Sequence, residues 1–277
     1  MSDDRATREW QAAAAGWRRW EPAIASLSWP LALRMAAVTE VGPGQRVLDV
    51  GCGIGDPTLQ VAVLVGPHGH VVGVDLAEAM LVTARERAAA LGLAHVEFVA
   101  GDVATMALPA PAFDVVLGRW SLIYLEDVVG TLARLRDALV PGGRIAVAAW
   151  APPDANPWIA VPFAALTDAG AAVDTDPTRP GVFHCSDDGA LARALLRAGF
   201  QTVDQERVRL SFFARDPGEF WTMLSEGTGG PLAPVLEGLD ASQSARVARR
   251  VSEDVARYRA GDVLRIPAQA QLAWGRA

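Results

Sequence analysis

Short apolar runs alternate with helical segments between residues 46 and 150 of this 277-residue chain. The apolar runs have the length of strands buried on both faces of a parallel sheet, and the segments between them have helical periodicity. The expected strands are 46–50, 70–74, 96–100, 113–117 and 144–150, and the expected helices between them are 56–65, 77–91 and 127–139. Strands that alternate with helices predict parallel βαβ units joined by right-handed crossovers.

Helical patterns precede this region, and a less regular pattern follows it. Residues 5–20 and 23–39 are expected helices, the second interrupted near Pro30. Beyond a proline-rich break at 151–157, the expected helices are 158–169, 189–198, 216–226 and 243–260, and the expected strands are 201–213 and 269–274. We divide the chain into an N-terminal helical lid (1–40), a ligand-binding core (41–150) and a remainder (151–277) that completes the sheet and carries cap insertions at about 151–186 and 214–262.

The composition is that of a soluble globular protein, with 51% hydrophobic and 21% charged residues. A formal net charge of −7 argues against nucleic acid or an anionic membrane as the main partner. Two cysteines, Cys52 and Cys185, are too few for a metal cluster, so no metal is expected, and they fit a reducing compartment. We read no signal peptide and no apolar run of about 18 residues, so a cytoplasmic protein is expected. The sequence leaves a homodimer open.

A glycine-rich loop follows the first expected strand, in the stretch 47–57. Strand, glycine loop and helix together bring backbone N–H groups and a helix N-terminus up to a ligand. Gly51 and Gly53 match the first two glycines of the dinucleotide fingerprint G-x-G-x-x-G, but Asp56 stands where its third glycine belongs. A carboxylate there would face a pyrophosphate unfavourably, whereas it suits an ammonium or a sulfonium. The loop therefore predicts a cationic nucleoside ligand without phosphate.

Acidic residues also follow the next two strands. Asp75 lies 24 residues beyond Gly51, near the spacing of an acid that accepts hydrogen bonds from ribose hydroxyls, although it could equally cap the helix that follows. Asp102 could accept from an adenine amine or simply stabilise a turn. Because ligands of open α/β sheets bind at the carboxyl ends of the strands, acids at the ends of three successive strands favour the binding interpretation.

The order of these motifs resembles that of the class I S-adenosylmethionine-dependent methyltransferases. The resemblance covers residues 41–150 and is carried by the segments 47–55, 74–75, 101–102, 113–116 and 139–144. Within that class the chain is most similar to the ubiquinone/menaquinone-biosynthesis and natural-product branch. The resemblance implies a Rossmann-like seven-stranded α/β sheet with the last strand antiparallel, S-adenosylmethionine as cofactor, S-adenosylhomocysteine as product and a small-molecule acceptor.

The resemblance also implies the roles of individual residues. The glycine loop would hold the methionine portion, Asp75 the ribose diol and Asp102 the adenine, while Arg119 would line the methionine side. The cofactor-binding residues expected in this way are Asp49, Gly51, Cys52, Gly53, Asp56, Asp75, Leu76, Met80, Asp102, Val103, Gly118 and Arg119.

Residues for the acceptor must come from beyond the fourth strand or from the caps. Arg119 could bind an acidic substrate group or an internal carboxylate, and His184 is the best general-base candidate, although a histidine near a helix start is often structural. The catalytic candidates are His184, Arg119 and Tyr124, and the expected substrate pocket comprises Trp17, Trp20, Trp120, Tyr124, Trp158, His184 and Trp221. These aromatic residues favour a hydrophobic small molecule, although core packing would produce the same composition.

Methyl transfer to an oxygen or carbon of a hydrophobic small molecule, in secondary metabolism or quinone-type biosynthesis, is therefore the expected activity. One alternative is a cyclase-type enzyme that binds S-adenosylmethionine without transferring its methyl group. Another is a non-catalytic binding module. A nicotinamide oxidoreductase is disfavoured by Asp56.

Overall fold

The computed structural model describes residues 4–109, 111–227 and 232–277. Its helices are α1 (Asp4–Arg19), α2 (Glu21–Val38), α3 (Thr58–Val65), α4 (Glu78–Ala90), α5 (Val128–Ala138), α6 (Pro157–Asp168), α7 (Ala190–Arg197), α8 (Pro217–Gly227), α9 (Ala233–Glu237) and α10 (Ala241–Val255), with 3-10 turns η1 (Leu122–Tyr124), η2 (Pro153–Ala155) and η3 (Ala256–Tyr258). Its strands are β1 (Arg46–Val50), β2 (His70–Asp75), β3 (Val96–Ala100), β4 (Phe113–Arg119), β5 (Leu139–Trp150), β6 (Gln201–Ala214), β7 (Arg259–Ala260) and β8 (Val263–Arg276).

The strands form one mixed sheet in the order β3-β2-β1-β4-β5-β8-β6. The pairs among β1 to β5 are parallel, and β8 runs antiparallel to both of its neighbours, β5 and β6. The expected α/β sheet of seven strands with the last strand antiparallel is thus confirmed. The two-residue β7, which pairs with β8, was not predicted because it is too short to carry a pattern.

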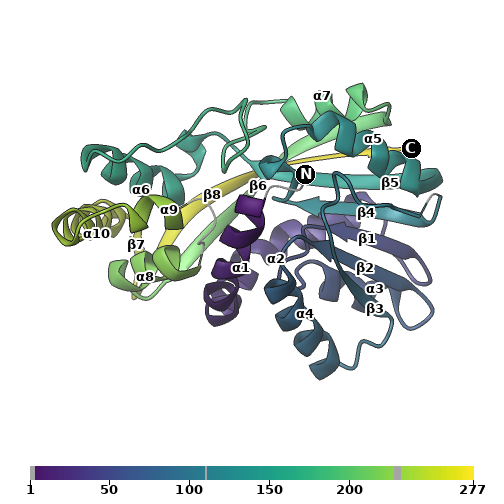
Figure 1. Ribbon diagram of the computed structural model, residues 1–277, viewed down its shortest axis with the longest axis horizontal. Coiled ribbons are helices and arrows are strands. Elements are labelled where there is room, and N and C mark those ends of the chain that lie inside the picture. The colour runs from purple at the N-terminus through teal and green to yellow at the C-terminus, as the bar shows by residue number, and fades with distance from the viewer. Residues whose placement is uncertain (1–3, 110, 228–231) are drawn as a thin grey trace.

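The strand order reverses between β1 and β4, in the middle of the sheet. Right-handed crossovers on the two sides of this point place α3 and α4 on one face of the sheet and α5 on the other. Figure 1 shows this arrangement, with α7 beside α5. The crevice at the carboxyl ends of β1 and β4 is where an open α/β sheet binds its ligands.

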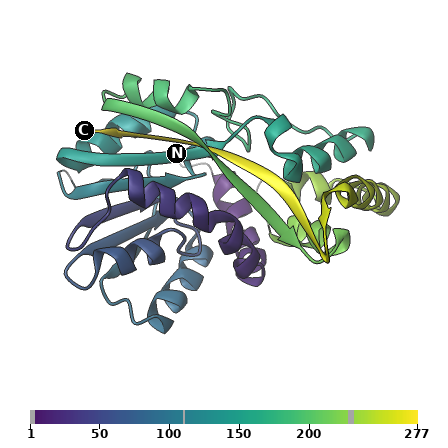
Figure 2. The same ribbon diagram turned by 180° about the vertical axis from the view of Figure 1, so that it is seen from behind.

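β6 and β8 extend well beyond the rest of the sheet as a two-stranded arm. They pair from Gln201↔Arg276 to Ala214↔Leu264, whereas β5 pairs with β8 only as far as Trp150↔Ala270. At about 3.3 Å per residue, the unshared part of β8 is about 20 Å long. Helices α6, α8, α9 and α10 gather around this arm and form a cap at one end of the molecule (Figures 1 and 2).

Two sequence predictions were wrong in detail for reasons connected with proline. The last strand was expected to begin at residue 269, but β8 begins at Val263 and contains Pro267, which reads as a strand break. α2 was expected to be interrupted near Pro30, but it runs unbroken through that residue. Its apolar face, including Leu31 and Met35, is fully buried, and this burial compensates for the backbone hydrogen bond that a proline removes.

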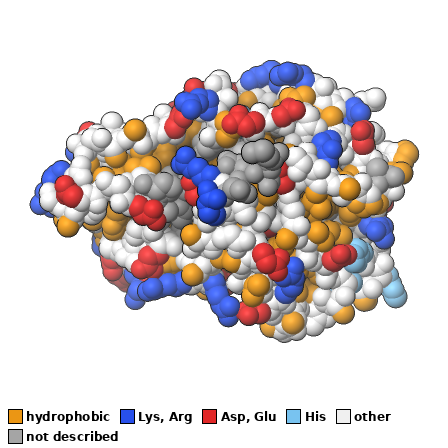
Figure 3. Space-filling model, viewed as in Figure 1, with side chains coloured by type: hydrophobic (Ala, Val, Ile, Leu, Met, Phe, Trp, Pro, Cys, Tyr) orange, Lys and Arg blue, Asp and Glu red, His pale blue; other side chains and the backbone are white. Residues whose placement is uncertain are grey.

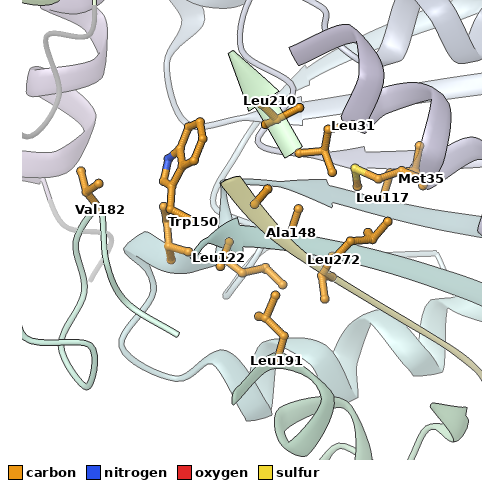
Figure 4. Packing of buried hydrophobic residues seen from close by; sticks show 14 of the residues in the cluster. Leu31, Met35, Leu117, Leu122, Ala148, Trp150, Val182, Leu191, Leu210 and Leu272 are labelled. Atoms are coloured by element: carbon orange, nitrogen blue, oxygen red, sulfur yellow. The ribbon is translucent and has the colours of Figure 1, made fainter. Parts of the chain in front are cut away.

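The hydrophobic core fills both faces of the sheet. Leu31 and Met35 of α2 pack from one side and Leu191 of α7 from the other, with Leu117 and Ala148 of the strands between them (Figure 4). Trp150 stands at the carboxyl end of β5, away from these residues, where the core meets the ligand-binding crevice.

The surface is charged but mixed in sign. Figure 3 shows arginine and acidic side chains interspersed over the face of Figure 1, without one dominant patch of either sign. In the described part of the chain, every helix is too short or too polar to cross a membrane.

Candidate functional site

A pocket opens at the carboxyl edge of the sheet, where the strand order reverses. Its wall includes residues of α1 and α2, the loops after β1 to β4, the end of β5, α6 and the β6 arm. It brings together ten of the expected cofactor residues: Gly51, Cys52, Gly53, Asp56, Asp75, Leu76, Met80, Asp102, Val103 and Arg119. Asp49 and Gly118, the other two, lie in β1 and β4 behind this wall. Residues that were selected because they follow the ends of different strands thus line one cavity.

The glycine loop approaches the loop after β4 so closely that Gly51 has no room for a side chain. A Cβ atom on Gly51 would lie 2.2 Å from the Cβ of Ser121, and the backbone φ of Gly51 is +69°. The loop is anchored to β2, because the N–H groups of Gly51 and Cys52 both donate to the Val74 carbonyl, at 2.8 and 3.0 Å. Glycine is therefore required at position 51 for both conformation and space.

Asp75 connects the glycine loop with the start of α4. Its Oδ2 accepts from the Gly53 N–H at 2.8 Å, and its Oδ1 accepts from the Ala77 N–H at 2.9 Å. Burial raises the pKa of Asp75, and these backbone hydrogen bonds act in the opposite direction. The hydrogen bond to the Ala77 N–H, just before the start of α4, agrees with the helix-start interpretation. Asp75 also lies on the pocket wall.

Asp102 has the hydrogen bonds of a turn residue. Its Oδ1 accepts from the Ala104 N–H at 2.9 Å, and its Oδ2 accepts from the Thr105 hydroxyl at 3.3 Å. Asp102 and Val103 nevertheless both line the pocket. Asp102 is thus a turn residue that also lies on the pocket wall, so the two interpretations are compatible.

A cluster of buried charges lies beneath the glycine loop. The guanidinium of Arg119 donates from Nη2 to the Asp56 carbonyl at 2.6 Å, while its Nε and Nη1 are buried without a hydrogen-bond partner in the described residues. Burial lowers the pKa of Arg119, and the charges of Asp56 and Asp49 oppose that shift. Two strong donors of Arg119 thus lack a partner in the described residues, and Arg119 lines the pocket.

Asp49 is the carboxylate partner of this cluster. Its Oδ2 accepts from the Thr58 hydroxyl at 2.5 Å, and its Oδ1 is buried without a partner in the described residues. Burial raises the pKa of Asp49 to about 6, although the Thr58 hydrogen bond and the charge of Arg119 lower it. Asp49 therefore lies behind the pocket wall, and its negative charge favours the charged form of Arg119.

The carboxylate of Asp56 is neutralised from within the protein. Its Oδ2 lies 3.1 Å from Nη1 of Arg87, and its Oδ1 accepts from the side-chain amide of Gln60. The sequence argument that this acid calls for a cationic ligand is weakened by that pairing. Asp56 still lines the pocket, and its carbonyl orients Arg119.

An aromatic wall adjoins the charge cluster. Trp120 lies between Arg119, whose guanidinium carbon is 4.8 Å from the centre of the indole, and Trp150, whose ring stacks on it at 4.1 Å and 12°. Trp120 has a backbone φ of +57°, which costs a non-glycine residue about 1–2 kcal/mol. Such conformations persist where the surrounding structure enforces them, and they cluster at functional sites.

The expected acceptor residues divide into two groups. Trp17, Trp120, Tyr124 and Trp158 line the pocket. Trp20, Trp221 and His184 are not part of that wall: Trp20 donates to Glu226 at 3.3 Å and Trp221 packs on the core. The ring Nδ1 of the buried His184 lies 3.0 Å from the Ile123 carbonyl, so the geometry favours its structural interpretation.

Several wall residues were missed by the sequence argument. They include Trp10 of α1, Ser121, Trp150, Ile159, Val182, Phe212 of the arm and Leu232. Trp150 could have been found, because it is the last residue of an expected strand. Trp10 approaches Tyr124 edge to face at 5.2 Å, and Phe212 reaches the pocket only because β6 extends into the cap; neither placement has a local sequence signal.

The sheet order, the glycine loop after β1 and the acids after β2 and β3 define a Rossmann-like enzyme of the methyltransferase type. Residues 42–174 match the model of a methyltransferase domain. Nocamycin O-methyltransferase of Saccharothrix syringae is 34% identical over 243 residues, covering 84% of this chain and 85% of that protein. Aklanonic acid methyltransferase DauC of Streptomyces sp. (strain C5) is 43% identical over 117 residues, 42% of this chain and 53% of that protein.

The solved structure of the [4+2]-cyclase SpnF has a TM-score of 0.59 at 22% identity, with 96% of each chain covered, and shows a shared fold. The chain belongs to the class I S-adenosylmethionine-dependent methyltransferases, in their small-molecule branch. It spans about half the length of the aklanonic acid relative and most of the nocamycin relative.

The residues of the pocket fit the cofactor of this family. A Cβ atom on Gly53 would meet nothing within 4 Å, so the glycine loop leaves open space beside that residue, and the unpartnered donors of Arg119 suit a carboxylate such as that of the methionine portion. The acids Asp75 and Asp102 offer acceptors on the same wall for hydroxyl and amine groups.

Proposed function

We propose that this protein transfers a methyl group from S-adenosylmethionine to an oxygen of a hydrophobic small molecule of the natural-product type. The observation that carries the proposal is the division of one pocket into a polar end and an aromatic end. The polar end holds the glycine loop, Asp75 and Arg119, and the aromatic end holds Trp120 and Trp150. The names of the nocamycin and aklanonic acid relatives support a small natural product as acceptor and, for nocamycin, an oxygen as the methylated atom.

The polar end has groups for each part of the cofactor. Arg119 would bind the methionine carboxylate through one of Nε and Nη1, which otherwise remain buried and unpaired in the described structure. Asp75 would accept from the ribose hydroxyls and Asp102 from the adenine amine, each while keeping its backbone hydrogen bonds. When bound, the cofactor supplies an activated methyl group on a sulfonium.

The aromatic end would bind the acceptor and exclude water. Holding two reactants within about 3–3.5 Å in the right orientation can supply about 7–11 kcal/mol of a barrier. The rings of Trp120 and Trp158 would provide this orientation by packing. Burial raises the pKa of Tyr124, so its hydroxyl stays protonated and would act as a hydrogen-bond donor.

Two measurements test the proposal. Isothermal titration with S-adenosylmethionine should give saturable binding at micromolar concentrations, and no binding at high micromolar concentration would overturn it. Mass spectrometry of turned-over acceptor should then show the gain of one methylene unit together with release of S-adenosylhomocysteine. A product of unchanged mass would instead identify the cyclase-type alternative, in which the cofactor is retained.

A further inference from the structure

Helix α2 is apolar on its exposed side as well as on its buried side. Its sequence contains only two charged residues, Glu21 and Arg34. Trp29 and Leu33, one turn apart, are 47% and 45% exposed. Figure 2 shows α2 on the near face of the sheet, where no other described element covers it. A helix that is apolar all round is normally buried on all sides, so the exposed side of α2 has the character of an interface.

The exposed residues of α2 form a single stripe. Besides Arg34, they are Pro22, Ser26, Trp29, Pro30, Leu33 and Ala37. Their spacing of three to four residues places them on one side of the helix. The stripe is symmetric about the midpoint of α2, between Trp29 and Pro30, because Ser26 and Leu33 lie equally far from that point and so do the two end residues.

This symmetry makes the stripe complementary to a second copy of itself. Two chains related by a two-fold axis through the midpoint would place their α2 helices antiparallel. Leu33 of each copy would then face the small Ser26 of the other, and Trp29 would face Pro30. Large side chains would therefore meet smaller ones along the stripe, as close packing requires, whereas parallel helices would place each residue against its own counterpart.

The charges beside the stripe are paired within the chain. Arg34 donates from Nη2 to Oε2 of Glu206 on β6 at 3.0 Å, and Glu21 pairs with Arg87 at 2.6 Å. The stripe is thus uncharged, although the whole chain carries a net charge of −7. Two copies could meet there without opposing like charges and without burying an unpaired one. This favours a second copy over a charged partner.

The apolar surface also has the size that a dimer needs. The 18 residues of α2 span about 27 Å at about 1.5 Å per residue. α3, on the same face of the sheet, adds the exposed Val63 and Leu64. A face of two helices is about 20 Å wide. These dimensions approach the surface of about 800 Å² per partner that a standard stable interface buries.

We propose that the protein is a homodimer whose two-fold axis passes through the midpoint of α2, so that the two α2 helices pack antiparallel through their exposed stripes. Ile24 and Leu27, on the other side of α2, line the pocket. The second copy therefore holds one wall of the pocket in place from outside. This proposal does not depend on the proposed function.

Sedimentation equilibrium tests the dimer. At about 50 μM the wild type should have twice the 29.3 kDa mass of one chain, and a monomer at that concentration would overturn the proposal. L33R should weaken dimer affinity at least about hundredfold, because it buries a charge without a partner. The matched control is L196R, since Leu196 of α7 is 57% exposed on the opposite face of the sheet. A dimer that persists in L33R, or that L196R disrupts equally, would also overturn the proposal.

The double variant S26E/L33R tests the antiparallel arrangement. In that arrangement the new carboxylate of each copy faces the new guanidinium of the other. The double variant should therefore recover at least about tenfold of the affinity that L33R loses. In a parallel pair each new charge would face its own counterpart, and no affinity would return. Circular dichroism checks that every variant is folded, and a folded double variant without recovery would overturn the antiparallel packing.

Discussion

Arg87 of α4 neutralises Asp56 of the glycine loop, with 3.1 Å between Nη1 and Oδ2. The same guanidinium donates to the Ile54 carbonyl at 2.7 Å and pairs with Glu21 of α2 at 2.6 Å. One side chain therefore connects the loop, the helix after β2 and the N-terminal helices. The acid that stands at the third glycine position of the dinucleotide fingerprint is accommodated by this contact.

R87A should destabilise the fold and the loop together. Removing one partner of a buried pair leaves the other charge uncompensated, and because Arg87 keeps 23% of its side chain exposed, we expect a loss of about 1–3 kcal/mol rather than the full cost of a buried pair. Cofactor affinity should fall as well, because the loop loses its anchor. Chemical denaturation and titration with S-adenosylhomocysteine measure the two effects.

E86Q is the matched control, since Glu86 is adjacent on α4 and pairs with Arg18 of α1 where both side chains are more than half exposed. Exposed pairs contribute about 0–1 kcal/mol. Equal losses in E86Q and R87A would contradict a special role for the Asp56 contact.

G51A should be more damaging than G53A. Both glycines have positive φ, but a Cβ on Gly51 would collide with Ser121, whereas one on Gly53 would meet nothing within 4 Å. We expect about 1–3 kcal/mol from overpacking in G51A beyond the backbone cost of about 1–2 kcal/mol that both variants share. Thermal denaturation and S-adenosylhomocysteine titration compare the two.

The double variant G51A/S121G provides the decisive comparison, because it removes the atom with which the new methyl group collides. It should recover part of the stability that G51A loses. Simple additivity of the two single substitutions would mean that the collision is relieved elsewhere and that the close approach of the two loops is not what requires glycine.

The parallel half of the sheet could be predicted because strands buried on both faces appear as continuous apolar runs. In the arm, β6 was predicted at 201–213 from its alternating pattern and is observed at Gln201–Ala214. The first part of β8 was not predicted, because Pro267 interrupts its pattern. The helix over Pro30 was misjudged for a related reason: local propensity opposed it, and burial against the sheet outweighed that propensity.

The cofactor side of the site was predicted from position at strand ends, and the same rule would have found Trp150. Position at a strand end does not predict which charged side chains pair with each other. Arg87 lies 31 residues beyond Asp56 along the chain, and only the packing of α4 against the loop brings them together. The acceptor side depends on α1, α6 and the arm, whose contacts with the core have no sequence period.

H184N should retain most of the methyltransfer rate. The Nδ1 atom of His184 contacts the Ile123 carbonyl, and an asparagine amide can donate to the same oxygen. A residue that acted as general base would contribute about 10²–10⁴-fold, so we expect kcat to change by less than about threefold. Steady-state kinetics with the natural acceptor decide the matter, and a fall of a hundredfold with unchanged cofactor affinity would restore His184 as the base.

D49N should stabilise the free protein at neutral pH. The pKa of Asp49 is about 6 in the fold against an ordinary value of 3.8, so the folded state holds its proton more tightly than the unfolded chain. The stability from this group is present below the ordinary value and is lost as pH rises through about 6. At about 1.4 kcal/mol per pKa unit, the advantage of D49N over the wild type should grow between pH 4 and pH 7 to about 3 kcal/mol at most.

Denaturation at a series of pH values checks this expectation, with the exposed Asp154 giving D154N as the control for loss of one carboxylate. Removing the Asp49 charge also takes a neighbouring counter-charge away from Arg119. Because Arg119 would then attract the methionine carboxylate more strongly, D49N is expected to be more stable and to bind S-adenosylhomocysteine at least as tightly as the wild type. If D49N were instead less stable than the wild type at pH 7, the charge of Arg119 would compensate the ionised Asp49 carboxylate more fully than its burial implies.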